Sequence, residues 1–253
     1  MKKVFILLIG LLFVSQAANS QSDVYTTSGA EVIFSWGDLQ YTDAYKNKYP
    51  QAAIVKQPVR FTLFFHFQQF LHLDLNNNIG FFTGIGLRNI GIISDETLPE
   101  NYQDNNPTYF DAKIIRRTYS LGIPLALKLG SFKNHLSIYG GGEIEWAFAM
   151  KEKWWDGHSR SGSKTKRTDW FSNNLNTFLP SVFVGVQLPG GANVKFRYYL
   201  EDFLNHNSGN SSATNRAHVV SDFSKYKQSG MLYVSLSYQI KTSKIVAQIS
   251  GSE

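Results

Sequence analysis

The amino-acid sequence predicts an all-β fold, an eight-stranded antiparallel up-and-down transmembrane β-barrel. Eight stretches alternate apolar and polar residues, the connectors between them are long and short in turn, and aromatic residues make up 15% of the chain. Successive side chains of a strand point to opposite faces, so each stretch offers one apolar and one polar face. Short turns at one end of a barrel and longer loops at the other are typical of outer-membrane proteins.

The predicted strands comprise, in chain order, residues 31–37, 59–75, 79–93, 113–129, 135–151, 177–188, 193–203 and 229–241. The alternation is clearest in the fifth, where Ile144 and Met150 fall on the apolar face and Glu143 and Glu145 on the polar face. The second, seventh and eighth strands alternate in the same way. The fourth contains Pro124, which cannot donate to the ladder and predicts a local bulge or an unpaired carbonyl.

The apolar face is predicted to point outward, toward lipid. Several stretches are long enough to cross a bilayer obliquely, and glycines on the polar face leave room inside a small barrel for large side chains. Aromatic residues also lie toward strand ends, where membrane barrels carry their girdles. They are Trp36, Phe61, Tyr119, Tyr198 and Tyr238. A soluble lipocalin-like barrel, with the apolar face inward, is the structural alternative.

Three segments are expected along the chain. Residues 1–20 read as a signal peptide, because Lys2 and Lys3 precede an apolar core that ends in small residues suited to cleavage. Residues 21–241 form the barrel, in the cell outer membrane, and residues 242–253 form a polar periplasmic tail. The chain has no cysteine, which excludes disulfides and thiol catalysis, and its formal net charge of +6 is too mild to indicate a nucleic-acid partner.

Residues 116–128, RRTYSLGIPLALK, resemble the YLEIPLLLK strand of the outer-membrane β-barrel domain family of Bacteroidota, which includes PorT-like proteins among the porin-family and OmpA-like barrels. Residues 139–142, YGGG, and the hairpin of residues 181–205 resemble the strands that follow in that family. Gly122 stands where the family usually has glutamate. The resemblance implies an eight-stranded barrel in the cell envelope and, through the PorT-like members, a link to protein secretion.

Charged residues on the polar faces are predicted to meet inside the barrel. They are Glu31, Arg60, Arg88, Arg116, Lys128, Glu143, Glu145, Lys195, Arg197 and Glu201. An eight-stranded barrel is just wide enough for its own side chains, and buried charges are tolerated when they are paired. The prediction is a packed network of ion pairs that closes the lumen, and the alternatives are a conducting pore or a catalytic cluster.

Two short patterns suggest chemistry and are weighed against simpler explanations. His135 and Ser137 form a His-x-Ser similar to that of outer-membrane lipid A deacylases, but they follow a short turn and face the lumen, which favours ordinary polar lumen residues. Asp74, Asn76 and Asn78 have the opening spacing of a calcium loop without its glycine and its final glutamate, which favours an Asn-rich turn. No catalytic, cofactor or metal site is therefore predicted.

Two predicted outer loops carry opposite charge. Residues 94–112 are acidic, whereas residues 152–176 are rich in basic residues and have tryptophans near both ends. The candidate contact residues, for lipopolysaccharide phosphates or a surface partner, are Trp154, Trp155, Lys164, Lys166 and Arg167. The alternative is that the tryptophans belong to the outer girdle while the basic stretch is solvated and pairs with the acidic loop.

The sequence thus predicts a non-enzymatic outer-membrane protein, a surface or assembly component that presents extracellular loops. Its expected partners are outer-membrane lipid and lipopolysaccharide, together with a protein at the loops or the periplasmic turns, and no cofactor is expected. A narrow porin-like channel or small-ligand carrier is the alternative function, and a lipid A-modifying enzyme is a third.

Overall fold

The structure is a computed structural model, and it describes residues 23–64, 66–104, 106–209 and 212–245. The predicted signal peptide lies outside the described residues. Helical structure is confined to α2 (Asp43–Lys48), α3 (Arg216–Val220) and the 3-10 turns η1 (Phe132–Asn134) and η2 (Pro189–Gly191) within these ranges. None of these described helices combines the length and the hydrophobicity needed to cross a bilayer.

Strands dominate the described chain. They are β1 (Asp23–Tyr41), β2 (Ala53–Lys56), β3 (Arg60–Thr62), β4 (Phe67–Asp74), β5 (Ile79–Pro99), β6 (Tyr109–Ser131), β7 (Leu136–Asp156), β8 (Lys164–Trp170), β9 (Phe178–Gln187), β10 (Ala192–Tyr199) and β11 (Tyr226–Ile245).

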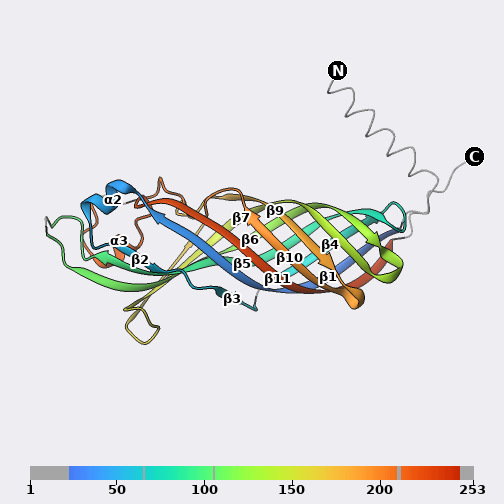
Figure 1. Ribbon diagram of the computed structural model, residues 1–253, viewed down its shortest axis with the longest axis horizontal. Coiled ribbons are helices and arrows are strands. Elements are labelled where there is room, and N and C mark those ends of the chain that lie inside the picture. The colour runs from blue at the N-terminus through green and yellow to red at the C-terminus, as the bar shows by residue number, and fades with distance from the viewer. Residues whose placement is uncertain (1–22, 65, 105, 210–211, 246–253) are drawn as a thin grey trace, which may run out of the picture.

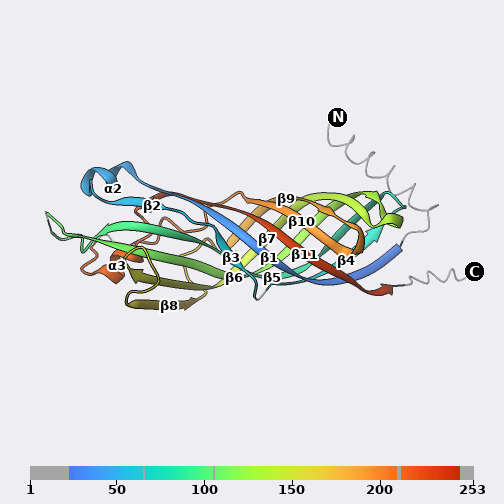
Figure 2. The same cartoon turned by 60° about the horizontal axis from the view of Figure 1, so that its bottom comes forward.

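The antiparallel strands close into a ring in the order β1, β4, β5, β6, β7, β9, β10 and β11, and β11 pairs back onto β1. β3 and β4 pair with successive parts of β1, so together they form the second strand of the ring. Outside the ring, β2 pairs with β5 and β8 pairs with β7. The predicted eight-stranded antiparallel barrel is confirmed. Figures 1 and 2 show an elongated body in which the crossing strands occupy one end and α2, α3, β2 and β8 the other.

The two ends of the barrel differ in their connectors. The start of β1 pairs with the end of β11, and this end also carries the short turns at residues 75–78, 132–135 and 188–191. The long excursions that contain α2, β8 and α3 lie at the opposite end (Figure 1). In outer-membrane barrels the short turns are periplasmic, so the opposite half is the extracellular one.

The apolar faces of the strands point outward, as predicted. Ile123 of β6 and Ile144 of β7 are register partners, and their side chains are 61% and 57% exposed. The neighbouring Glu143 is almost fully buried inside. An apolar outside around a charged inside is the inverse of a soluble barrel and is what a lipid bilayer requires of a membrane barrel. The chain is therefore a transmembrane β-barrel of the outer-membrane type.

A bulge changes which residues of β7 face outward. The register with β6 shifts between Tyr119 and Ser120, so Phe148 of β7 is an extra residue. Beyond it the alternation is inverted: Met150 is buried in the interior, whereas Lys151 lies on the outer face opposite Arg117. The sequence-based assignment of Met150 to the outer, apolar face was wrong, because a one-residue insertion exchanges the two faces of everything that follows.

Pro124 interrupts the ladder between β5 and β6, but the register is the same on both sides of it, so the predicted bulge is absent from this pair of strands. Register pairs are present at Thr83 and Leu125 and again at Gly86 and Gly122, with none between them. The carbonyl of Pro124 accepts a hydrogen bond from the hydroxyl of Thr83 at 2.7 Å. A side chain thus satisfies the backbone acceptor that the proline leaves outside the ladder.

Several strands extend farther than predicted. β5 reaches Pro99 and β7 reaches Asp156, so much of the predicted acidic and basic loops is strand, and β8 forms a further strand within the latter. β11 continues to Ile245, where residues 242–245 pair with or border the first residues of β1, so the polar tail does not begin at residue 242. Residues 246–253 lie outside the described ranges.

The interior is filled in three layers along the barrel axis. An aromatic cluster occupies the periplasmic part, an ionic network occupies the middle, and a second hydrophobic core fills the extracellular half. The aromatic cluster comprises Phe70, Phe82, Ala126, Tyr139 and Phe183. The extracellular core contains Tyr41, Tyr45, Tyr49 and Tyr102 in ring contact with one another, together with residues of α3 and its flanks such as Val219 and Phe223.

Candidate functional site

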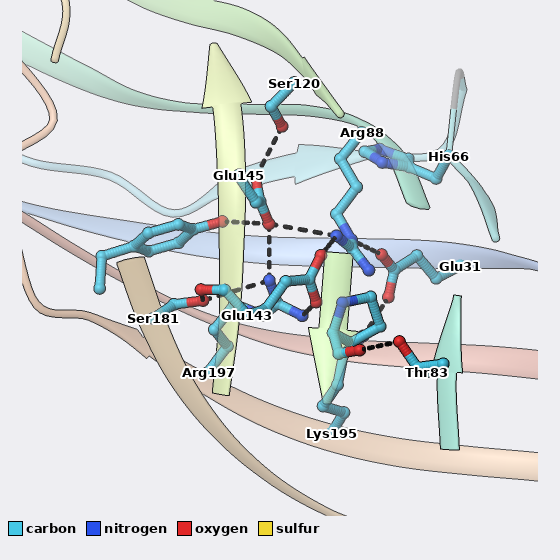
Figure 3. A network of polar contacts seen from close by, with 12 residues as sticks. Glu31, His66, Thr83, Arg88, Ser120, Glu143, Glu145, Ser181, Lys195 and Arg197 are labelled. Carbon is cyan, nitrogen blue, oxygen red and sulfur yellow. Dashed lines mark hydrogen bonds and ion pairs between the residues drawn. The ribbon is translucent and has the colours of Figure 1, made fainter. Parts of the chain in front are cut away.

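The middle layer of the lumen is a network of three carboxylates and three cations, shown in Figure 3. Arg88 of β5 donates from Nε to Glu31 at 2.5 Å and from Nη1 to Glu143 and Glu145. Arg197 of β10 donates to the same two glutamates of β7, and its bond to Glu145 is 2.6 Å long.

Further hydrogen bonds extend this network, although Nη2 of Arg88 and Nε of Arg197 have no hydrogen-bond partner among the described residues. Lys195 donates to the second oxygen of Glu31 at 2.9 Å. The hydroxyls of Ser120 and Tyr199 donate to Glu145 at 2.6 and 3.1 Å. The charges balance, and each carboxylate accepts from more than one donor, so the cost of burying ions is offset by pairing and charge-assisted hydrogen bonds.

Two glycines make the space that these side chains occupy. A Cβ at Gly86 would meet the guanidinium of Arg88, and a Cβ at Gly122 would overlap the carboxylate of Glu143. Glycine therefore stands at position 122 because a larger residue would displace the ion pair.

The structure brings six of the ten predicted lumen charges together and distributes the other four. Arg116 lies inside but in the extracellular half, and Lys128 lies near the periplasmic end in an ion pair with Asp74 at 2.6 Å. Arg60 is buried without an acidic partner among the described residues and donates to Asn89.

Glu201 does not belong to the lumen network. It is exposed, because β10 ends at Tyr199 and the chain leaves the barrel wall before it reaches the glutamate. The prediction that placed Glu201 inside extended the alternation of the strand two residues too far.

A second buried cluster lies in the extracellular half, around Glu96. Arg116 donates to Glu96 at 3.1 Å and to Glu152 at 2.9 Å, and the hydroxyls of Tyr41 and Tyr226 donate to Glu96 at 2.7 Å each. Burial by itself would raise the pKa of Glu96, but the nearby charges of Arg116 and Lys225 and the hydrogen bonds it accepts outweigh that effect and lower the pKa to about 2. The cluster is thus held together by an ionised carboxylate.

Lys225 is also buried in this extracellular cluster. Its ammonium donates to the carbonyls of Val219 and Val220 at 2.6 and 3.1 Å. Burial lowers the pKa of Lys225 to about 8, and the charge of Glu96 opposes that shift. Lys225 thus binds the last carbonyls of α3 and holds this helix against the interior of the extracellular half.

No open path through the barrel is visible among the described residues. The void between Phe82, Tyr139, Lys195 and Arg197 has a volume of about 10 Å³, which is room for about one water molecule. At the periplasmic mouth an open vestibule of about 640 Å³, lined by Tyr25, Asp74, His135 and others, ends against the filled interior.

The candidate outer contact residues lie in different environments. Trp155 is on the outer side of β7 but is only 8% exposed, whereas Lys164 and Lys166 project from the same face of β8 and are exposed. Arg167 is on the opposite face of β8 and forms an ion pair with Asp169 at 2.6 Å. Trp154 is buried in the extracellular core against Phe110, so it cannot be a surface contact; the bulge at Phe148 turned it inward.

The expected pairing between the basic stretch and the acidic loop is limited, in the described part of the chain, to His158 and Asp111 at 3.3 Å, which form an ion pair only when the imidazole is protonated. Other acidic side chains of the loop have partners elsewhere. Asp95 pairs with Lys113, Glu96 with Arg116 and Glu100 with Arg216. None of these basic partners belongs to residues 164–167.

The structure brings together neither the residues of the deacylase-like His-x-Ser pattern nor those of a calcium loop. His135 is exposed in a left-handed turn position with φ of 54°, whereas Ser137 is buried, and the carboxylates of Glu143 and Glu145 are taken up by arginines. Asn76 accepts hydrogen bonds from the amides of Asn78 and Ile79, which is a turn of the predicted kind. No cluster of three or more potential metal-ligating side chains occurs within the described ranges.

Two features were missed by sequence reasoning. One is the extracellular core, whose signal was the spacing of Tyr41, Tyr45 and Tyr49 at helical intervals. The other is a group of cations on the outer wall, which includes Arg117, Lys151 and Lys153. The sequence feature that could have indicated it is the alternation of every second residue, which continues beyond the apolar positions into basic ones. The sequence assigned Lys151 to the opposite face.

No protein-family model matches the sequence, and no curated protein matches it. Solved structures that are similar to this chain include Neisserial surface protein A, at 12% identity and a TM-score of 0.36 over 86% of this chain and 97% of that one. They also include Ail of Yersinia pestis, at 10% identity and a TM-score of 0.32 over 85% of this chain and 99% of that one. A third is the outer membrane protein OprG of Pseudomonas aeruginosa, at 12% identity and a TM-score of 0.30 over 88% and 98%. At TM-scores this low, nothing about the activity of this chain follows from the likeness.

Proposed function

We propose that this protein is a closed, non-enzymatic outer-membrane surface protein whose folded extracellular half is its functional part. The observation that supports this most directly is the filled interior. Aromatic side chains, paired charges and a second hydrophobic core follow one another along the axis, and the void beside Lys195 and Arg197 holds about 10 Å³. A barrel filled in this way has no route for a solute, so its exposed extracellular surface is what it offers to other molecules.

The construction of the extracellular half supports the same proposal. β5, β6 and β7 continue beyond the apolar belt as paired strands, and Arg116, Glu96 and Glu152 join them to α3 and β11 from the inside. Loops that only connected strands would not need a core of their own. A rigid extracellular surface suits the binding of a macromolecular partner, since little ordering is required on association.

The experiment for closure is conductance in a planar lipid bilayer. The purified protein is expected to show no stepwise current, and a variant in which Phe82 and Tyr139 are replaced by alanine should stay silent too, because the ionic network and the extracellular core still fill the lumen beyond the periplasmic layer. Stable steps from the unaltered protein would support the narrow channel instead. Pull-down from native membranes, with and without shaving of the extracellular half by protease, tests for a surface partner.

The link to protein secretion is a finer form of the same proposal. It rests on the resemblance of residues 116–128 to PorT-like barrels. Deletion of the gene should then reduce the set of secreted proteins without changing outer-membrane permeability, and an unchanged set would remove the link while leaving the surface role in place.

A further inference from the structure

The outer wall above the apolar belt carries a dense group of cations. On β6 the outward positions Leu121, Ile123 and Leu125 are exposed and apolar, and the outward series then continues through Tyr119 to Arg117. The belt therefore ends at Tyr119, and the next outward residue toward the extracellular side is basic.

Neighbouring strands extend this group sideways. Arg117 is the register partner of Lys151 on β7, and Lys153, one step farther out, is the partner of Lys166 on β8. Lys164 follows on β8 opposite Trp155. Partners in a sheet point to the same face, so these cations share one surface. We call Arg117, Lys151, Lys153, Lys164 and Lys166 the basic face.

The basic face lacks internal compensation. None of its five members forms an ion pair with an acidic residue among those the structure describes, and the adjacent Lys113 is already bound to Asp95 at 2.8 Å. Burial and the charges of Arg117, Lys166, Lys164 and Lys151 lower the pKa of Lys153. Like charges directly opposite each other on neighbouring strands, as Lys153 and Lys166 are, destabilise a sheet unless an anion lies between them.

Its position points to a lipid as the source of that anion. An aromatic girdle directly borders it on the belt side: Tyr119 stacks on Phe148, and Phe148 stacks on Trp170. The ammonium of Lys151 lies 5.1 Å from the ring centre of Tyr119. Aromatic girdles mark the interface of the bilayer, so the basic face lies at the level of the outer-leaflet headgroups.

A groove beside the basic face offers room for the rest of such a lipid. It has a volume of about 630 Å³, and Arg117, Lys153 and Trp155 line one side of it while Phe61 and Phe64 line the other. Phe61 and Phe64 are 59% and 71% exposed. A groove with apolar and cationic walls fits an amphiphile that carries both acyl chains and phosphates.

We propose that the basic face and the adjoining groove bind the phosphate groups of lipopolysaccharide in the outer leaflet, with its acyl chains against the apolar belt. Lysine and arginine side chains at a membrane surface attract anionic headgroups, and several of them act together. The phosphates supply the counter-charge that the described protein does not. This site is separate from the lumen and does not depend on whether the extracellular half has a protein partner.

The test compares two triple variants that change the net charge equally. One is Lys151→Gln, Lys153→Gln and Lys166→Gln, and the control replaces the exposed Lys46, Lys48 and Lys56 by glutamine. Each protein is purified in neutral detergent, its barrel is checked by heat-modifiable migration on gels, and it is titrated with bis-phosphorylated lipid A under native mass spectrometry. The basic-face variant should bind at least about tenfold more weakly than the unaltered protein, and the control variant should bind normally.

Three further arms distinguish the sources of the anion. Dephosphorylated lipid A should bind the unaltered protein as weakly as the phosphorylated form binds the basic-face variant. Phosphatidylglycerol should bind more weakly than lipid A, and inorganic phosphate at the same concentration should not displace lipid A. Unchanged binding by the basic-face variant, equal binding of dephosphorylated lipid or phosphatidylglycerol, or displacement by free phosphate would each overturn the proposal.

Discussion

Arg88 shows at the scale of a single residue how the interior is stabilised. Its side chain is almost fully buried and donates to carboxylates from two different strands, Glu31 on β1 and the pair Glu143 and Glu145 on β7. Removing one partner of such a network leaves the others charged and buried, which costs more than the network contributes when intact.

Replacing Arg88 by methionine should therefore lower the stability of the barrel by about 3–5 kcal/mol. The measurement is the urea concentration at the midpoint of unfolding in detergent. The folded fraction is read from the migration of unheated samples on gels. Arg167→Met is the matched control, because its exposed ion pair with Asp169 should contribute less than about 1 kcal/mol. Equal midpoints for the two variants would mean that the network carries no stability.

The double replacement Glu143→Leu and Glu145→Leu tests the same network from its acidic side. It leaves Arg88 and Arg197 buried in the lumen without their partners on β7, so the melting temperature in detergent should fall. A melting temperature equal to that of the unaltered protein would refute the idea of an ionic plug.

Glu96 gives the extracellular half a dependence on acid. Its pKa is about 2 in the folded protein against an ordinary value of 4.5. A lowered carboxyl pKa stabilises the fold above the ordinary value, and that stabilisation, on the order of 3 kcal/mol, is lost as the pH falls from 4.5 toward 2. Unfolding midpoints measured across this window should fall, and Glu96→Gln should flatten the fall. A variant with the same slope as the unaltered protein would assign the acid sensitivity to other carboxylates.

At the scale of an element, the seam between β3 and β5 is closed by side chains. β3 pairs with β1, and the ladder between β4 and β5 stops at Phe67 and Leu87. Beyond it Arg60 donates to the carbonyl of Asn89 at 3.0 Å and to its side-chain oxygen at 2.7 Å. The guanidinium thus takes the place of a missing strand neighbour.

Arg60→Met should open this seam locally. The loss of hydrogen bonds from a charged donor costs about 1.5–3 kcal/mol, and the amides next to Asn89 on β5 should exchange faster with deuterium. The amides near Leu127, where β6 is paired on both sides, should not. Unchanged exchange at β5 would show that the backbone of this segment is held in another way.

At the scale of the whole molecule, the outward apolar belt and the filled lumen have the same physical cause, which is the lipid around the barrel. The belt replaces the hydrophobic core that a soluble barrel would have inside, and paired charges take the interior because a bilayer tolerates them nowhere else in the span. The extracellular half then regains an ordinary core, with Phe203, Val219 and Phe223 inside.

Ile123→Lys separates a membrane barrel from a soluble one. In the middle of the belt the lysine should reduce the stability of the protein in lipid vesicles by about 2–4 kcal/mol, whereas Thr165→Lys on the exposed β8 should have little effect. The measurement is equilibrium unfolding from vesicles. Equal stability of the two variants would contradict a lipid-facing position for Ile123.

Much of the fold followed from local pattern. The period of two placed Glu143 and Glu145 inside and Ile144 outside, and the spacing of short turns set the number of strands. The failures share a cause: Met150 was given the wrong face, and Trp154 was placed in an outer loop instead of inside an extended β7, because the bulge at Phe148 and the length of the strand depend on how β7 meets β6. A sequence shows that side chains alternate, but a one-residue slip in register comes from the partner strand.

The sequence by itself determined the strand number, the alternation of apolar and polar faces, and most of the residues from which the lumen charges come. Only the tertiary structure decided that Glu31 pairs with Lys195, far away in the chain, that the extracellular half has a core, and that Lys151, Lys153 and Lys166 share an outer surface. The physical reason is that alternation is a property of one strand, whereas partners, cores and shared faces require the register between strands and the closure of the ring.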